Sequence, residues 1–409
     1  MRVLFLNPAG GLGGAERCLL DLAASLRAHV GARGIELGLI AGRDGPLLRE
    51  AEALGVRVVR LLLSDRLAAL GDSALLTHGA RALPALGCRA AGAALEAANY
   101  ARRLGVAVRQ FSPSVVHSNG IKMHLFAAAA FVRAPLLWHI RDFIGERPLV
   151  SRALSACAWR ADAGIAISNA VAEDARGLLP RLPLSVIHDA IDTDVFTPVG
   201  PASDLDDLAG GDPAPAGTVR VGLIATYARW KGHDVFLQAA RLVKARLSNS
   251  EIRFYVIGGP IYDTAASEYA QEELRALASQ LGAENYVRFI PFQGRVDEVH
   301  RALDIVVHTG TRREPFGRTI AEAMATGKPV VASRESGAAE LCVDTVDVVC
   351  VALRNPDALA DALCPLIIDS QRRQRLGSAA RSAAVERFSR ARLAEQVLNV
   401  YRDAGCAVG

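Results

Sequence analysis

Short apolar runs alternate with longer amphipathic stretches in both halves of the chain. In the first half, such runs predict buried strands at Val3–Asn7, Glu36–Ala41, Val56–Leu61, Val115–His117 and Leu136–His139. Helical patterns separate them, which is the rhythm of a parallel sheet. A second series begins at VRVGLIATY and continues through IRFYVIGG, YVRFIPF and DIVVHTG. The pattern therefore predicts an α/β protein with two doubly wound domains.

A change of composition separates the two series. Residues 198–217 are rich in proline, glycine and aspartate, which is typical of a domain boundary. We therefore predict a first domain over residues 1–197, a linker over 198–217 and a second domain over 218–389. A chain of 409 residues also exceeds what a single core usually holds.

Composition and charge narrow the classes of partner. The net charge of +4 is small for this length, so it does not predict nucleic-acid binding, although an anionic membrane surface or substrate stays open. The seven cysteines are scattered without a CxxC pair, which favours a reduced, cytoplasmic protein over a zinc or disulfide framework. The opening MRVLFLNPAGG is predicted to be a first strand and not a signal peptide. No run reaches the roughly 18 apolar residues that span a bilayer, so membrane contact would be peripheral, at the inner face.

One segment of the second half places two acids around a helix start. Glu314 precedes a turn at Pro315 and Gly317, and a helix is predicted from about Arg318, with Glu322 one turn inside it. The N–H groups at a helix start bind anions, and carboxylates suit sugar hydroxyls. The segment therefore predicts a nucleotide-sugar site, with an ordinary loop and two solvated acids as the alternative.

A basic loop follows the first strand of the second half. ARWKGHD places Arg229, Lys231 and His233 at a helix start, where two cations and the helix N–H groups can grip a diphosphate. The alternative is a basic surface turn.

Three loops of the first half carry candidate ligands at strand ends. PAGGLGGAER brings Gly13 and Gly14 to a helix start, and its spacing is not the dinucleotide fingerprint GxGxxG. Parallel sheets bind ligands at the carboxyl ends of their strands. Two later loops follow strands there, and their polar residues are His117, Asn119, Lys122, His124, His139, Arg141 and Asp142. A structural role for these histidines, and a simple tight turn for the glycines, remain the alternatives.

Two further patterns concern lipid and metal. The alanine-rich stretch 67–109, with Arg81, Arg89, Arg102 and Arg103, predicts either solvated helices or a basic face that contacts anionic lipid. The Asp-x-Asp pairs at 192–194 and 204–206 lie in or beside the linker, so we predict no metal site.

The motifs together resemble a known family. The order acid-x-Phe-Gly and then Glu-Ala, at Glu314, Phe316, Gly317 and Glu322, resembles the signature of retaining GT-B glycosyltransferases of family four, and so do GGAER and Trp-Lys-Gly. The resemblance implies two Rossmann-like domains that face each other across a cleft. It also implies that the first domain binds the acceptor, that the second binds the donor, and that a last helix at about 390–409 packs back on the first domain.

The resemblance also implies roles for residues. Lys231 would hold the donor diphosphate, and Arg229 would replace an arginine that the family has at Thr226. Glu314 would hold the donor sugar and Glu322 the ribose. The remaining donor contacts implied are Gly13, Gly14, Phe316, Gly317, Arg318 and Thr319.

On the acceptor side, the family histidine of the first loop is replaced by Asn119. His139 therefore becomes the catalytic candidate beside Lys231 and Glu314. His117, Asn119, Lys122 and Arg141 are the acceptor-side candidates.

The implied function is retaining transfer of a hexose from a nucleoside diphosphate sugar to a sugar or a lipid-linked acceptor, without a metal or other cofactor. Polysaccharide, glycolipid or natural-product glycoside synthesis would use such an enzyme. A non-catalytic sugar-nucleotide-binding partner protein, and a phosphorylase or epimerase, stay open as alternatives.

Overall fold

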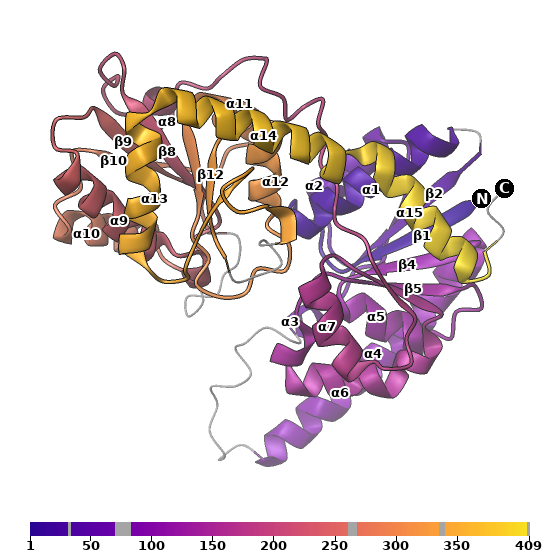
Figure 1. Ribbon diagram of the computed structural model, residues 1–409. Helices are drawn as coiled ribbons and strands as arrows, with labels where there is room; N and C mark the ends of the chain where they lie inside the picture. The colour runs from indigo at the N-terminus through magenta and orange to yellow at the C-terminus, as the bar shows by residue number, and fades with distance from the viewer. Residues whose placement is uncertain (32–33, 70–82, 261–267, 335–339, 407–409) are drawn as a thin grey trace. The chain divides into compact units, whose positions relative to one another are not determined.

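The protein is described by a computed structural model that covers residues 1–31, 34–69, 83–260, 268–334 and 340–406 (Figure 1). The chain divides into two compact units. Unit 1 comprises Met1–Ala190 and Arg390–Gly409, and unit 2 comprises Ile191–Ser389. The last part of the chain thus belongs to the same unit as the first.

Unit 1 is built on a seven-stranded sheet in the order β3-β2-β1-β4-β5-β6-β7, and neighbouring strands run parallel. Its strands are β1 (Arg2–Asn7), β2 (Glu36–Ala41), β3 (Arg57–Arg60), β4 (Val115–Asn119), β5 (Leu136–Ile140), β6 (Ala163–Ala166) and β7 (Leu184–Val186). The central strands are buried almost throughout, because helices cover both faces of the sheet, and this is why they appear in the sequence as continuous apolar runs.

The helices of unit 1 form two layers. They are α1 (Gly14–Val30), α2 (Pro46–Ala53), α3 (Asp65–Ala69), α4 (Leu83–Phe111), α5 (Ile121–Ala129), α6 (Pro148–Cys157), α7 (Asn169–Leu178) and α15 (Arg390–Asp403). Helix α15 packs along α1, whereas α4, α5 and α6 lie side by side beneath β4 and β5 (Figure 1). An ion pair between the partly exposed Arg390 and the buried Asp21 fastens α15 to α1. Ser168 caps α7 by accepting a hydrogen bond from Val171 N, as its position before the helix predicts.

Unit 2 repeats the plan with a six-stranded parallel sheet in the order β10-β9-β8-β11-β12-β13. Its strands are β8 (Val219–Ile224), β9 (Ile252–Ile257), β10 (Val287–Ile290), β11 (Ile305–His308), β12 (Val330–Ser333) and β13 (Val349–Val351). Its helices are α8 (Leu205–Leu208), α9 (His233–Arg246), α10 (Gln271–Gln280), α11 (Val296–Ala302), α12 (Arg318–Ala325), α13 (Pro356–Ile368) and α14 (Ser370–Phe388). The predicted pair of doubly wound α/β domains is therefore confirmed.

Strand order reverses once in each sheet. In unit 1 the chain turns back between β1 and β4, and in unit 2 between β8 and β11. Loops that leave such neighbouring strands diverge to opposite faces and open a crevice where α/β proteins bind ligands. The candidate loops after β1, β4, β8 and β11 all start at these two points.

The segment 198–217, predicted as a linker, belongs to unit 2. Asp206 in α8 is buried, and its carboxylate accepts hydrogen bonds from Arg253, Tyr255 Oη and the backbone of Ala214. These bonds fasten the segment to β9. Its proline, glycine and aspartate content is that of a long loop wrapped on a domain, which composition alone does not distinguish from a linker.

Candidate functional site

A lysine and a glutamate from two loops of unit 2 form a close ion pair. Lys231 ends a 3₁₀ turn, η4 (Arg229–Lys231), after β8, and Glu314 lies between β11 and α12. Lys231 Nζ lies 2.7 Å from Glu314 Oε2 and 4.0 Å from the centre of the Trp230 ring. The two side chains are 17% and 12% exposed, so water screens the pair only in part. The structure thus brings together two of the predicted donor ligands.

Two threonines hold the loop after β8 against the loop after β11. Thr309 Oγ1 lies 3.1 Å from the Lys231 carbonyl and 3.0 Å from that of Gly232, and Thr311 N donates to the Trp230 carbonyl at 2.7 Å. Gly232 has a φ of 73°, and a Cβ there would lie 1.9 Å from the Thr309 carbonyl oxygen. Only glycine permits both this dihedral and this approach. The contact fixes the lysine next to its partner.

Replacing Gly232 with alanine should lower the stability of unit 2 by about 2 kcal/mol or more, because a positive φ is strained and the new Cβ meets backbone. Gly282 is a matched control in the same unit: its φ is 64°, and a Cβ there would meet nothing within 4 Å. Urea unfolding of G232A and G282A should show the larger loss for G232A. Equal losses would mean that the close approach of Gly232 to Thr309 does not contribute to the free energy of unfolding.

Glu314 is ionised despite its burial. Burial raises its pKa, but the charge of Lys231 and the imidazole of His308 outweigh that effect and lower the pKa from 4.5 to about 2. His308 Nε2 lies 3.4 Å from Glu314 Oε2. An ionised carboxylate only accepts hydrogen bonds, and sugar hydroxyls donate them. The charge state is therefore suited to the predicted role.

Helix α12 begins beside this pair. Its N-cap, Gly317, is in the left-handed region with φ 95° and has no side-chain cap. One turn later, Glu322 is buried and accepts a hydrogen bond of 2.7 Å from Arg318 Nε, and its second oxygen lies 3.7 Å from His300 Nε2. Burial raises the pKa of Glu322, but Arg318 and His300 outweigh it and lower the pKa. Arg318 and Glu322 therefore hold each other, and a ribose contact by Glu322 stays a prediction.

The flanking residues of the motif differ in exposure. Phe316 is 3% exposed and packs edge-on against Phe388 of α14, with the ring centres 6.0 Å apart. Its side chain anchors the loop, and a contact between Phe316 and the donor stays a prediction. Thr319, at the second position of α12, is partly exposed.

Arg229 forms an ion pair with a glutamate other than Glu314. Its guanidinium lies 3.0 Å from Glu273 of α10 and 4.3 Å from the centre of the Tyr269 ring. In this structure the guanidinium is held by Glu273, and the predicted share of Arg229 in the phosphate grip stays a prediction. Sequence spacing could not show this, because Glu273 lies 44 positions downstream.

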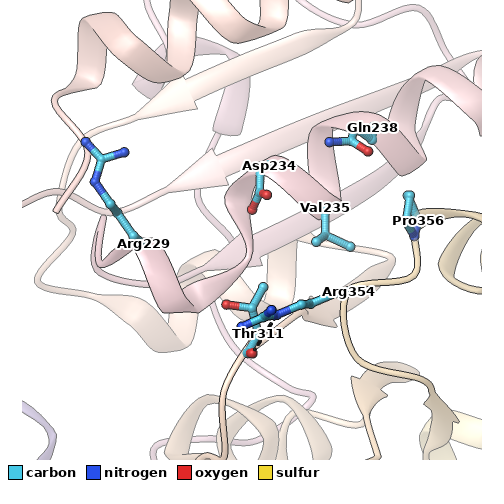
Figure 2. A pocket seen from close by; sticks show the side chains of 7 residues that line it. All are labelled: Arg229, Asp234, Val235, Gln238, Thr311, Arg354 and Pro356. Carbon is cyan, nitrogen blue, oxygen red and sulfur yellow. Dashed lines mark hydrogen bonds between the residues drawn. The ribbon is translucent and has the colours of Figure 1, made fainter. Parts of the chain in front are cut away.

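Arg229 also borders a pocket of about 280 Å³. The pocket is lined by Arg229, Asp234, Val235, Gln238, Thr311, Arg354 and Pro356. Figure 2 shows the guanidinium of Arg229 turned away from the other lining residues, while Arg354 Nε donates to the Thr311 carbonyl at 3.1 Å. Lys231 and Glu314 do not line this pocket.

In unit 1, the glycines after β1 have different roles. A Cβ at Gly10 would lie 2.3 Å from the Asp44 carbonyl oxygen, and one at Gly45 would lie 2.3 Å from that of Gly10. Packing of the two loops requires these glycines. A Cβ at Gly14 would meet nothing within 4 Å, and Gly13 caps α1 without a side-chain hydrogen bond. A Cβ at Gly13 would lie 2.9 Å from Glu16 Oε2, so a carboxylate lies next to the start of α1, and the donor roles of Gly13 and Gly14 stay predictions.

Arg141 is the centre of a buried polar network. Its Nη1 lies 2.7 and 2.8 Å from the two carboxylate oxygens of Asp189, and its Nε donates to Asn119 Oδ1. Asn119 in turn donates to Asn7 Oδ1 at 2.7 Å, and Asn7 donates to Glu16 at 3.2 Å. The network joins the ends of β1, β4 and β5 to the start of α1. Asn119, which replaces the family histidine, thus links Arg141 to Asn7 through its side-chain hydrogen bonds.

The two strand-end histidines belong to the same network. His117 Nε2 lies 2.9 Å from His139 Nδ1, and His117 Nδ1 lies 2.7 Å from the hydroxyl of Tyr401 in α15. Arg141 Nη2 lies 3.3 Å from the same His139 Nδ1 and can only donate. Nδ1 of His139 therefore accepts the hydrogen bond from Arg141, and it must also accept the one from His117 Nε2. Because His117 Nε2 carries the proton, Nδ1 of the neutral His117 ring accepts, and the Tyr401 hydroxyl donates to it.

Burial keeps both rings neutral. It lowers the pKa of His117 to about 3 and, together with Arg141, moves the pKa of His139 well below 6.5. His139 is 2% exposed, so its side chain does not reach solvent in this structure. This geometry favours a positioning role over the direct catalytic role predicted for His139.

The remaining acceptor-side candidate, Lys122, and His124 are also engaged internally. Lys122 Nζ donates to the carbonyl of Ala68. His124 lies 2.6 Å from Ser118 Oγ and stacks on Trp138, and burial lowers its pKa to about 3.

Sequence reasoning missed Asn7, which the strand-end rule could have found, and Tyr401, for which no local signal exists. It treated the acids of the Asp-x-Asp pairs as metal candidates to be discounted. Asp192 and Asp204 instead accept hydrogen bonds from backbone N–H groups that follow them.

The basic stretch 67–109 forms α4 over its second half, where Arg102 and Arg103 are exposed. The side chains of Arg81 and Arg89 lie outside the described part of the chain. In that described part, no helix combines the length and the apolar character that crossing a bilayer requires.

Two family models match the sequence. The model described as "Glycosyl transferases group 1" matches residues 213–383, and that described as "Glycosyltransferase Family 4" matches residues 12–195. A D-inositol 3-phosphate glycosyltransferase of Xylanimonas cellulosilytica is 32% identical over 269 residues, which cover 64% of this chain and 60% of that protein. An alpha-maltose-1-phosphate synthase of Mycobacterium tuberculosis is 31% identical over 258 residues, covering 59% of this chain and 63% of the synthase. The chain thus spans less than two thirds of these relatives.

Solved structures share the whole fold. HepE of Anabaena, crystallised with UDP and glucose, has a TM-score of 0.76 at 24% identity and covers 98% of this chain and 99% of its own. A glycosyltransferase from Rickettsia africae has a TM-score of 0.78 at 18% identity, with 99% of each chain covered. At these identities the likeness concerns the fold alone.

Proposed function

Because this chain belongs to the GT-B glycosyltransferases of group 1, we propose that it moves a sugar from a nucleoside diphosphate sugar to a hydroxyl acceptor. The observation that carries the proposal is the Lys231–Glu314 ion pair. It lies on the two loops that diverge at the strand-order reversal of unit 2, beside the start of α12. A cation, a fixed carboxylate and a helix start are the groups that a diphosphate and its sugar need.

In this proposal the donor replaces part of the ion pair. The diphosphate accepts hydrogen bonds from Lys231 and from N–H groups at the start of α12, and Glu314 turns its ionised oxygens to hydroxyls of the sugar. As the glycosyl bond breaks, negative charge grows on the diphosphate, and Lys231 stabilises it in a site that is largely shielded from water. Glu322 remains our candidate for the ribose.

We further propose that the reaction retains the anomeric configuration and transfers a hexose. The acceptor hydroxyl would attack the face from which the diphosphate departs, through an oxocarbenium-like state, and a phosphate oxygen would take its proton. The chain supplies a cation and a helix dipole for the charge of the leaving group.

Unit 1 is proposed to bind the acceptor at the ends of β4 and β5. The network of Arg141, Asn119 and the two histidines would set the backbone of these loops and the start of α1. His139 then acts through its neighbours, as a positioning residue. Polysaccharide, glycolipid or natural-product glycoside synthesis is the proposed context. The cytoplasmic location stays a prediction.

A panel of nucleoside diphosphate sugars tests the proposal by thermal shift and donor hydrolysis. One donor should stabilise the protein by roughly 2.7 kcal/mol at a hundred times its dissociation constant. The same donor should be hydrolysed slowly without acceptor, because a transferase activates the glycosyl bond towards water. Stabilisation without any hydrolysis would favour the alternative, a non-catalytic sugar-nucleotide-binding partner protein. No stabilisation by any donor would contradict both.

A further inference from the structure

A stripe of exposed apolar and basic residues follows α6 and the 3₁₀ turn after it, η3 (Ala158–Arg160). Leu149 is 75% exposed and Trp159 is 71% exposed. Arg152 is exposed between them, one helical turn from Leu149. Covering apolar side chains that are this exposed would gain hydrophobic free energy. Such side chains, when they cluster, often mark an interaction site. The stripe is therefore a candidate interaction surface.

Phe131 extends the stripe to the end of α5. It is 66% exposed and has a φ of 49°, which is rare for a bulky residue and costs free energy. The guanidinium of Arg160 lies 4.5 Å from the centre of the Phe131 ring and 5.1 Å from that of Trp159. One arginine is thus held between two exposed aromatic rings, so all three side chains belong to one patch.

Helix α4 continues the patch on the other side of α5. A Cβ at Gly105 would lie 3.0 Å from the carbonyl oxygen of Ala130, next to Phe131, so the two helices touch there. The exposed residues of α4 include Leu95, Arg102, Val106 and Arg109, whose spacing places them on one face. Figure 1 shows α4, α5 and α6 side by side in one layer of unit 1.

Most of the exposed charged residues on this layer are arginines. Arg102, Arg103, Arg109, Arg133 and Arg152 are exposed on it. The sequences 92–111, 129–133 and 146–162 contain three acids, Glu96, Glu146 and Asp162, and Glu146 is exposed just before α6. Glu96 pairs with Arg66, and Asp162 accepts a hydrogen bond from Leu136 N. The patch is therefore positive between its aromatic residues.

We propose that this face of unit 1, formed by α4, the end of α5, α6 and η3, docks on a lipid bilayer that contains anionic headgroups. Trp159 and Phe131 would enter the interfacial region, where amphipathic rings are favoured, and the arginines would meet the headgroup phosphates. The core of a protein–protein interface is a continuous apolar surface with few charges. Here the apolar side chains are separated by arginines, which suits a lipid surface better than a protein partner. The inference does not depend on the proposed sugar transfer.

Co-sedimentation with vesicles tests it. The full-length chain should bind vesicles of phosphatidylcholine with phosphatidylglycerol more tightly than pure phosphatidylcholine, and added salt should weaken the binding. F131S/W159S should weaken it by about tenfold or more, since two large apolar side chains lose their burial. R102Q/R109Q/R152Q should weaken it by about fivefold for each arginine.

I368S/R372Q is the matched control, because Ile368 is 68% exposed and Arg372 is exposed, both in unit 2. It should bind as the unchanged chain does. Absence of binding to anionic vesicles, or equal binding by F131S/W159S, would overturn the proposal. A dimer that F131S/W159S converts to monomer would also overturn it, since a second copy would then cover the patch. Donor-induced thermal shift should be unchanged in every patch variant, which separates this test from that of sugar transfer.

Discussion

Replacing Lys231 with glutamine should lower kcat for sugar transfer by about 10²–10³. The lysine is the cation that pairs with Glu314 at 2.7 Å and, in the proposed reaction, the one that stabilises the departing diphosphate. That interaction strengthens as charge develops, so the loss should fall on kcat more than on KM. Steady-state rates with the donor found by thermal shift, and with K231R beside K231Q, measure it. K231R keeps the charge and should retain part of the activity.

R229Q is the matched control for this prediction. Arg229 belongs to the same 3₁₀ turn but pairs with Glu273, with side chains 41% and 49% exposed. An ion pair so exposed contributes little, and the rate should change less than about threefold. If R229Q loses as much as K231Q, Arg229 shares the phosphate grip in spite of its ion pair with Glu273. If K231Q keeps the full rate, the proposed donor site is wrong.

The pH dependence of stability gives a second readout of the same pair. The pKa of Glu314 is about 2 in the fold and ordinarily 4.5, so its ionisation contributes stability that is present above pH 4.5 and lost as the pH falls through 2. In K231Q this pKa should rise, because the effect of burial is then opposed by His308 alone. The stability lost by K231Q should then be greatest at neutral pH and shrink as the pH falls. Urea unfolding of both proteins across this range measures the difference.

The parts of this site that follow from the sequence are those whose signals are local. Lys231 and Glu314 each follow an apolar strand, and the rule that parallel strands end at one edge predicts that they lie close together. Gly232 is also a local signal, because a loop whose backbone closely approaches another backbone requires a glycine there. Fold class was predictable for a similar reason, since buried parallel strands leave continuous apolar runs.

The parts that sequence reasoning missed depend on partners far along the chain. No residue near Arg229 in the sequence indicates that it forms an ion pair with Glu273. Likewise, no residue near His117 indicates a hydrogen bond with the hydroxyl of Tyr401. Side-chain burial is likewise a tertiary property. A histidine after a strand has the same local sequence whether it faces a ligand or a second histidine, so local sequence alone does not separate a catalytic role of His139 from a positioning role.

Replacing Arg141 with alanine should destabilise unit 1 by about 3–5 kcal/mol, the usual cost of removing one partner of a buried ion pair. Arg141 and Asp189 are 8% and 6% exposed, and the arginine also donates to Asn119. Its loss would leave a buried carboxylate without its cation. Trp138 in β5 is fully buried in the same unit, so its fluorescence during urea unfolding reports the change.

Arg147 provides the comparison for Arg141, because it follows the same strand and pairs with Asp142 at 2.9 Å, with side chains 48% and 43% exposed. R147A should cost less than about 1 kcal/mol, because water already screens that pair. The double variant R141M/D189M should recover part of the loss of R141A, since it removes the uncompensated charge and fills the space with apolar atoms. Equal losses for R141A and R147A would mean that the Arg141 network contributes no more than a surface contact. In that case the positioning role of His139, which depends on the network, would also be wrong.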